Sequence, residues 1–213
     1  MRTRCLFVAL LALFALLACG GGEGAGGAAL SFSDAFDAPG GWRVSSDPEV
    51  EIAYANGGLS IEIKVIDRVA WSVAGLKFKD GVVSVDATPV GGPEDNAFGL
   101  VIRHVDDRRF YRFEISSDGF FAVQAPQGNL GWKFLVDWTE SPAIRRGREA
   151  NRLQVECRGP TMAFYVNDAE LARVKDGSFT AGDVGVIAGT FYTEPGTHIL
   201  FDNFRVEPLP ETD

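Results

Sequence analysis

Apolar residues alternate singly with polar ones along most of the chain after Leu30, and this pattern predicts β-strands rather than helices. In three segments the alternation is regular enough to assign one buried face to each strand. These faces carry Val83, Val85 and Ala87; Tyr111, Phe113 and Ile115; and Leu153, Val155 and Cys157. The whole pattern predicts about thirteen strands.

Turn-forming residues separate the expected strands. The clearest are Asn56-Gly57-Gly58, Asp80-Gly81, Gly91-Gly92-Pro93, Asp106-Asp107, Asp118-Gly119, Asn167-Asp168 and Asp176-Gly177. Many short strands without helices indicate a sandwich of two antiparallel sheets or a closed barrel, and the lack of an internal repeat argues against a propeller. Gly92–Asn96 and Thr139–Arg148 are predicted loops, because each mixes glycine or proline with charged residues.

The first residues have the pattern of an export signal. Arg2 and Arg4 precede an apolar stretch that is too short to span a bilayer, so residues 1–18 are predicted to be a signal peptide. The end of this segment, Leu16-Leu17-Ala18-Cys19, resembles the bacterial lipobox, which implies cleavage before Cys19 and lipidation of its thiol. The alternative is an ordinary secretory signal in which Cys19 has no special role.

The segment after the expected cleavage site is rich in glycine, so residues 19–30 are predicted to be a lipidated cysteine followed by a flexible tether. Two or three acyl chains would attach the protein durably to a membrane without inserting it. We therefore expect a location in the bacterial cell envelope, at the outer membrane or cell surface, with contact to the membrane through the lipid anchor.

Charge and cysteine content restrict the remaining possibilities. The chain has 20 basic and 29 acidic residues and a net charge of −9, so nucleic acid is not an expected partner. Cys5 lies in the expected signal and Cys19 is the expected lipidation site, which leaves Cys157 without a partner for a disulfide. Cys157 is in phase with the buried positions of its strand, so it is predicted to be a small core residue.

Two regions of the sequence resemble concanavalin A-like jelly rolls. Asn96–Arg103, followed by a turn and Phe110–Ile115, resembles the central hairpins of that superfamily, and Asn151–Val155, Phe164–Asp168 and Phe201–Val206 resemble its closing strands. The similar families are the 3-keto-disaccharide hydrolase-like domains, the laminin G-like domains and the laminarinase-type glucanases. The resemblance implies an all-β, concanavalin A-like jelly-roll sandwich of two antiparallel sheets over residues 31–207, with 208–213 as a C-terminal tail.

The resemblance predicts a fold more specifically than an activity, because the matched residues are strand hydrophobics, glycines and turn residues. Laminarinase-type enzymes carry paired carboxylates at alternating positions of one strand, and no Glu-x-Asp-x-x-Glu motif occurs here. Glu94 and Asp95 are adjacent and would point to opposite faces of a strand. We therefore expect a non-catalytic domain that binds carbohydrate or another envelope ligand. A sugar-modifying hydrolase and a protein-binding adhesive domain stay open as alternatives.

The candidate ligand-binding residues are polar and aromatic side chains expected outside the core. Arg103, Arg112 and Glu114 are expected on the non-core face of two central strands, where Trp132 and Trp138 could stack on sugar rings. The alternative is that the charged groups are simply solvated and the tryptophans belong to the core. A pocket in which Glu114, Asp137 or another acidic residue meets an arginine or a histidine would favour hydrolysis.

No cofactor is certain from the sequence. Several relatives hold a structural calcium between the N-terminal segment and an aspartate of the closing strand, and this resemblance makes Asp34 and Asp202 the first candidate ligands. Calcium requires six to eight oxygen ligands, so backbone carbonyl groups would have to supply most of the others. The alternative is that both aspartates are ordinary polar residues.

Overall fold

The alternating segments form strands that pair throughout in antiparallel fashion. The computed structural model describes residues 31–210. The predicted signal peptide, the lipidation site Cys19, the whole of the predicted tether and the last three residues of the predicted tail lie outside the described residues. No helix among residues 31–210 has the length and apolar character needed to cross a membrane.

The larger sheet has nine strands. Their order across the sheet is β13-β12-β11-β6-β15-β4-β3-β2, and β1 pairs with a further part of β15. Their bounds are β1 Phe32–Asp34, β2 Ser45–Ser46, β3 Val50–Ala55, β4 Gly58–Ile63, β6 Gly81–Gly91, β11 Asn151–Arg158, β12 Thr161–Val166, β13 Ala169–Lys175 and β15 Thr197–Glu207.

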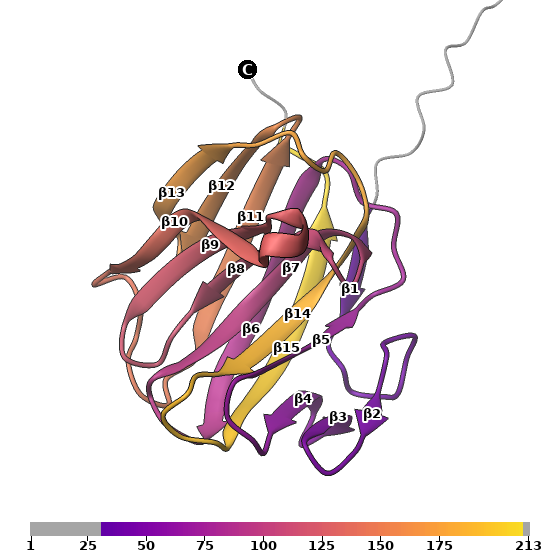
Figure 1. Cartoon of the computed structure of the whole chain (residues 1–213). Coiled ribbons are helices and arrows are strands. Elements are labelled where there is room, and N and C mark those ends of the chain that lie inside the picture. Colours follow the sequence, from indigo (N-terminus) through magenta and orange to yellow (C-terminus); the bar gives the residue numbers. More distant parts are fainter. Residues whose placement is uncertain (1–30, 211–213) are drawn as a thin grey trace, which may run out of the picture.

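The smaller sheet has six strands in the order β10-β9-β8-β7-β14-β5. Their bounds are β5 Arg68–Val73, β7 Asn96–Asp106, β8 Arg109–Ile115, β9 Phe120–Pro126, β10 Trp132–Glu140 and β14 Asp183–Thr190. A single 3-10 turn, η1 Gly128–Leu130, connects β9 to β10. The two sheets form two layers (Figure 1).

One hydrophobic core fills the space between the sheets, and the three predicted buried faces all contribute to it. The nine residues predicted for these faces are each fully buried, Cys157 among them. Burial raises the pKa of the Cys157 thiol to about 12, so the thiol behaves as a small apolar group. The predicted sandwich of two antiparallel sheets is confirmed. The described residues form fifteen strands, rather more than the sequence predicted, partly because β2 has only two residues and shows no alternation.

Strands β7, β8, β9 and β10 follow one another in the sheet as they do in the chain. In such an antiparallel meander, every second connection lies at the same end of the sheet. The turn between β8 and β9 therefore lies beside the start of β7 and the end of β10, and the end of β14 lies there too because β14 runs antiparallel to β7. This arrangement brings together four segments that are far apart in the sequence.

Candidate ligand-binding site

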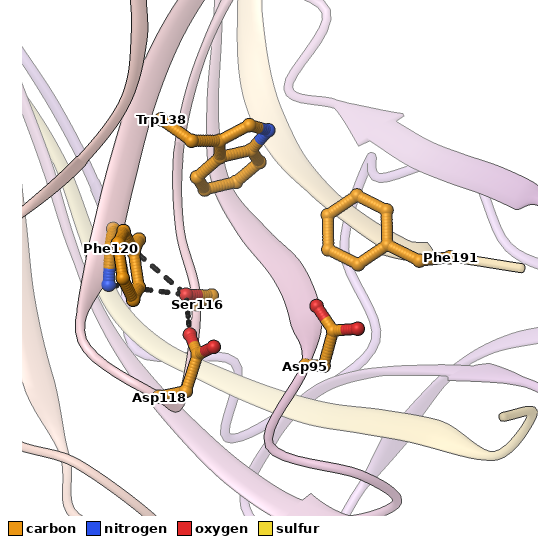
Figure 2. A pocket seen from close by; sticks show the side chains of 6 residues that line it. All are labelled: Asp95, Ser116, Asp118, Phe120, Trp138 and Phe191. Carbon is orange, nitrogen blue, oxygen red and sulfur yellow. Dashed lines mark hydrogen bonds between the residues drawn. The ribbon is translucent and has the colours of Figure 1, made fainter. Parts of the chain in front are cut away.

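A pocket of about 440 Å³ lies where these four segments meet, on the outer face of the six-stranded sheet. Three aromatic side chains and three polar ones line it: Phe120, Trp138 and Phe191, with Asp95, Ser116 and Asp118. Figure 2 shows the three rings around the pocket and the two carboxylates along one side. All three rings are partly exposed, so they are available for contact with a ligand.

The turn between β8 and β9 supplies the polar side of the pocket. The Gly119 amide donates a hydrogen bond to the Ser116 carbonyl at 3.1 Å, and the Ser116 amide donates to the Phe120 carbonyl at 2.8 Å. Gly119 has a φ of +101°, which side-chain-bearing residues rarely adopt. This tight turn places Ser116, Asp118 and Phe120 next to one another.

A buried asparagine fixes this turn to the loop that carries Asp95. Asn96 is fully buried, and its side-chain amide donates to the Pro93 carbonyl at 2.6 Å and to Ser117 Oγ at 2.9 Å. Its carbonyl oxygen accepts from the Ser117 amide at 3.0 Å. Because every polar atom of this side chain has a partner, the two loops are held together before any ligand arrives.

The loop that carries Phe191 packs against the same region. A Cβ atom at Gly92 would lie 2.3 Å from the Gly196 carbonyl oxygen, so only glycine allows the two loops to approach this closely. On the pocket side, the Thr193 hydroxyl donates to Asp95 Oδ2 at 3.3 Å. The pocket therefore has preorganised walls on both sides.

A polar row runs along the same outer face, next to the pocket. Arg112 and Glu114 alternate with the core residues of β8, as predicted, and Gln124 of β9 lies directly opposite Arg112. The Arg112 guanidinium donates to Gln124 Oε1 at 2.7 Å and lies 3.3 Å from Glu114 Oε2, while the Gln124 amide donates to Glu114 Oε2 at 3.2 Å. We call these three residues the polar row.

Glu114 is the most unusual member of the polar row. The residue is 1% exposed, and its Oε1 atom has no hydrogen-bond partner within the described part of the chain. Burial raises the pKa of its carboxyl group, and the nearby Arg112 charge opposes this shift. Glu114 does meet an arginine, but it is not among the residues that line the pocket. A glycosidic bond held in the pocket therefore has no exposed Glu114 carboxyl group beside it.

Beyond the polar row, the outer face carries a second apolar cluster, part of which is exposed. Its buried members are Val101, Phe110 and Ile187, and Val69, Trp71, Val73 and Trp132 pack against them. The rings of Trp132 and Phe110 are 4.8 Å apart at their centroids, and the Arg112 guanidinium lies 4.3 Å from the Trp132 ring centroid. Both contacts are favourable aromatic geometries. Trp132 is therefore packed against Phe110 and Arg112, and its exposed part lines a separate pocket with Arg108, Pro126 and Asn129.

Arg103 does not share the face of Arg112 and Glu114, so this part of the sequence prediction is wrong. The strand is irregular at this point, and Arg103 has a φ of +54°. The bulge turns the side chain inward, where it is fully buried. Its guanidinium donates to the carbonyl groups of Lys79, Gly159 and Phe179 and to Asp80 Oδ1. Arg103 therefore stabilises several chain segments and does not contact the pocket.

The two predicted calcium ligands are engaged in local contacts. Asp34 Oδ1 accepts from the Phe36 amide at 2.8 Å, and its Oδ2 accepts from the Trp42 indole at 2.9 Å. Asp202 Oδ1 accepts from the Asn203 amide at 2.6 Å. Within residues 31–210, no group of three or more acidic, cysteine or histidine side chains is arranged to hold a metal. The calcium site stays a prediction from the resemblance.

Sequence reasoning found only one residue of the pocket, Trp138. It assigned Asp118 and Gly119 to a turn and the segment before Asn96 to a loop, and both assignments are confirmed. The order of the strands in the sheet could have indicated other residues of the pocket. In a meander the segment before β7 and the turn after β8 share one end of the sheet, so the pattern could have placed Asp95 and Asp118 together.

Comparison with known proteins shows the fold. No protein-family model matches the chain, and curated protein sequences give no match. Among solved structures, the carbohydrate-binding module CBM66 from Bacillus subtilis is similar with a TM-score of 0.64, at 16% identity over 78% of this chain and 96% of that module.

Two further structures are similar over most of this chain. A Bacillus subtilis protein of unknown function with a galectin-like fold has a TM-score of 0.62, at 12% identity over 85% of this chain and 96% of that one. A xylan β-1,4-xylosidase from Bacillus halodurans C-125 has a TM-score of 0.59, at 16% identity over 82% of this chain, but only 38% of the enzyme is covered. The chain thus has a jelly-roll β-sandwich fold like that of these structures.

Proposed function

We propose that this protein is a non-catalytic carbohydrate-binding module whose pocket holds one end of a glycan. The main observation behind this proposal is the pocket, which Phe120, Trp138 and Phe191 surround. Asp95 and Asp118 border the same space and offer hydrogen-bond acceptors. Aromatic rings offer flat apolar surfaces for a sugar ring, and the acceptors fix the direction of its hydroxyl groups. The likeness to a carbohydrate-binding module supports the same proposal.

The geometry also supports binding over hydrolysis. Hydrolysis of a glycoside by paired carboxylates requires an acid and a base that both reach the scissile bond. Glu114, the one described carboxyl group on this face with a raised pKa, is buried and lies outside the pocket lining. A sugar-modifying hydrolase remains the second candidate, because solved glycosidases are among the similar folds and burial raises the pKa of the Glu114 carboxyl group.

A glycan array probed with the full-length chain tests this proposal. We expect selective binding to a small set of glycans, strong loss of binding in the Trp138→Ala variant, and near-normal binding in the Trp132→Ala variant. The array is repeated with calcium and with a chelator, and binding that requires calcium would support the predicted metal site. An array without any bound glycan would contradict the proposal and favour a protein ligand.

Any glycan that binds is then incubated with the protein and analysed for cleavage or modification. An unchanged glycan agrees with a non-catalytic module. Turnover that is lost in Glu114→Gln but retained in Glu207→Gln, a matched change at an exposed position of the other sheet, would instead establish the hydrolase alternative.

We further propose that the module is displayed on the bacterial envelope through lipid on Cys19, at the outer membrane or cell surface. The support is the lipobox-like end of the predicted signal. Mass spectrometry of the mature protein should find an N-terminal cysteine with the mass of attached acyl chains, and Cys19→Ser should release the protein from the membrane fraction. An unmodified N-terminus at another residue would contradict lipidation.

A further inference from the structure

The pocket presents hydrogen-bond acceptors but almost no side-chain donors. The Ser116 hydroxyl donates its proton to Asp118 Oδ1 and accepts from the Phe120 amide at 3.2 Å, so it offers no free proton to a ligand. Both aspartates are acceptors. The indole N–H of Trp138 is the single side-chain N–H of the lining, and Figure 2 places it on the upper edge of the ring, with both carboxylates below. A ligand must therefore supply the donors.

The pocket also carries negative charge that no described basic residue neutralises. Neither Asp95 nor Asp118 takes part in any ion pair found within residues 31–210. The nearby Arg146 packs its guanidinium against Gly119 and pairs with Glu140. Asp95 is exposed and Asp118 is partly buried, so the two charges act over the pocket with partial screening by water.

The three rings add to the same electrostatic preference. The face of an aromatic ring is negative, and it attracts a cation placed within about 6 Å of the ring centre. Trp138 and Phe191 approach edge to face, at 5.7 Å between centroids, while Phe120 lies on the opposite side of the pocket in Figure 2. Figure 2 shows rings on three sides of the pocket and the two carboxylates along its lower side, and together they form a cage suited to an ammonium group.

A further acceptor lies on the same strand face. Glu114 lies on the outer face of β8, and Ser116 follows two residues later, in the turn after the strand. Its Oε1 atom is buried and lacks a partner among the described residues. An unpaired buried acceptor is unusual in a folded protein, but Glu114 does not line the pocket, so the case for the ligand rests on Asp95, Asp118 and the three rings.

From these observations we propose that the pocket selects an amino sugar with a free, protonated amine. This inference rests on the proposed carbohydrate-binding function and specifies its ligand class. The ammonium group would lie between Asp95 and Asp118 and donate to their oxygens, while the sugar ring packs on Trp138. A neutral sugar leaves the charges unmatched, and an acidic sugar is repelled by them.

The test compares three sets of ligands that differ in one substituent. These are the methyl glycosides of glucosamine, galactosamine and mannosamine, their N-acetylated forms, and the parent hexosides. Binding to the full-length chain is followed by Trp fluorescence and calorimetry at about pH 6, where a sugar amine carries a proton. We expect at least one free-amine sugar to bind about tenfold more tightly than both matched neutral forms.

Variants separate a specific pocket from general attraction to an acidic protein. Asp95→Asn and Asp118→Asn keep the shape of the side chain but remove its charge, and each should abolish the preference for the free amine. Glu207→Gln, at an exposed position of the other sheet, should leave it unchanged. Trp138→Ala retains both carboxylates, so loss of binding in this variant excludes non-specific charge attraction.

The outcomes distinguish this inference from the function on which it rests. If no free-amine sugar binds more tightly than its neutral forms while a neutral glycan binds the array, the amino-sugar inference is overturned and the carbohydrate-binding function stands. If neither these sugars nor any array glycan binds, both are overturned. A preference that survives both aspartate variants would also contradict the inference.

Discussion

Trp132 and Trp138 lie on the same face of the same strand, but their surroundings are opposite. Trp132 belongs to the second apolar cluster, where Phe110 and Arg112 pack against its ring. Trp138 has Phe191 as its aromatic neighbour and borders an open pocket. The difference shows that an aromatic residue outside the core is available for ligands only where the protein leaves its ring uncovered.

The polar row lies between these two regions, and breaking it should have the largest effect on stability. Arg112→Ala leaves the buried Glu114 carboxylate without its charged neighbour, so we expect a loss of about 3 kcal/mol in the free energy of unfolding at neutral pH. Denaturant titration followed by circular dichroism measures this loss.

The double variant Arg112→Ala/Glu114→Gln is the control for this prediction. It removes the buried charge together with its partner and should recover most of the lost stability. If the single variant is as stable as the wild type, the contact between Arg112 and Glu114 does not hold this face together.

The two tryptophans provide the second test. Replacing Trp132 should mainly lower stability, whereas replacing Trp138 should mainly lower glycan binding. Trp132→Ala removes contacts with Phe110 and Arg112 and should lower the free energy of unfolding by about 2 kcal/mol, with little change in glycan affinity. Trp138→Ala should lower stability by less than about 1 kcal/mol but abolish glycan binding. Equal stability losses in the two variants would contradict the difference in packing between the two tryptophans.

The sequence predicted the strands better than the site because alternation is a local property. The faces of Val83, Tyr111 and Leu153 were evident from neighbouring residues, and the structure confirms them. The position of Arg103 was not predictable in this way, because a bulge with positive φ changes the face of the strand without changing the residue pattern.

The pocket was harder still to predict, because its residues come from four segments. Asp95, Asp118 and Phe191 each appear in the sequence as part of an ordinary turn or loop. Only the order of strands in the sheet brings them together, and this order depends on long-range pairing of β14 with β7. Trp138 was noticed because tryptophan is rare, whereas its difference from Trp132 required the contacts of each ring.

A third, smaller effect should appear in the pH dependence of stability. Burial raises the pKa of Glu114 above the ordinary value of 4.5, so the folded protein keeps this proton over a pH range in which the unfolded chain has lost it. The stability that Glu114 contributes is therefore present below pH 4.5 and is lost as the pH rises through the raised pKa.

Glu114→Gln cannot titrate, so its stability relative to the wild type should increase as the pH rises from about 4 to about 7. Denaturant titrations of both proteins across this range measure the change, with Glu207→Gln as a control that should follow the wild type. A constant difference between Glu114→Gln and the wild type would mean that the Glu114 pKa is not raised by folding.

The smallest expected effect concerns the ring of Phe191, which lines the pocket beside Trp138. Phe191→Leu keeps an apolar side chain in the pocket wall but removes the edge-to-face contact with Trp138 and the negative ring face. We expect glycan affinity to fall about threefold to tenfold, with stability unchanged within about 0.5 kcal/mol, because the side chain is partly exposed. Calorimetric titration with a glycan selected on the array measures this change. Unchanged affinity would mean that Phe191 only limits the size of the pocket, and the cage would then depend on Trp138 and Phe120 alone.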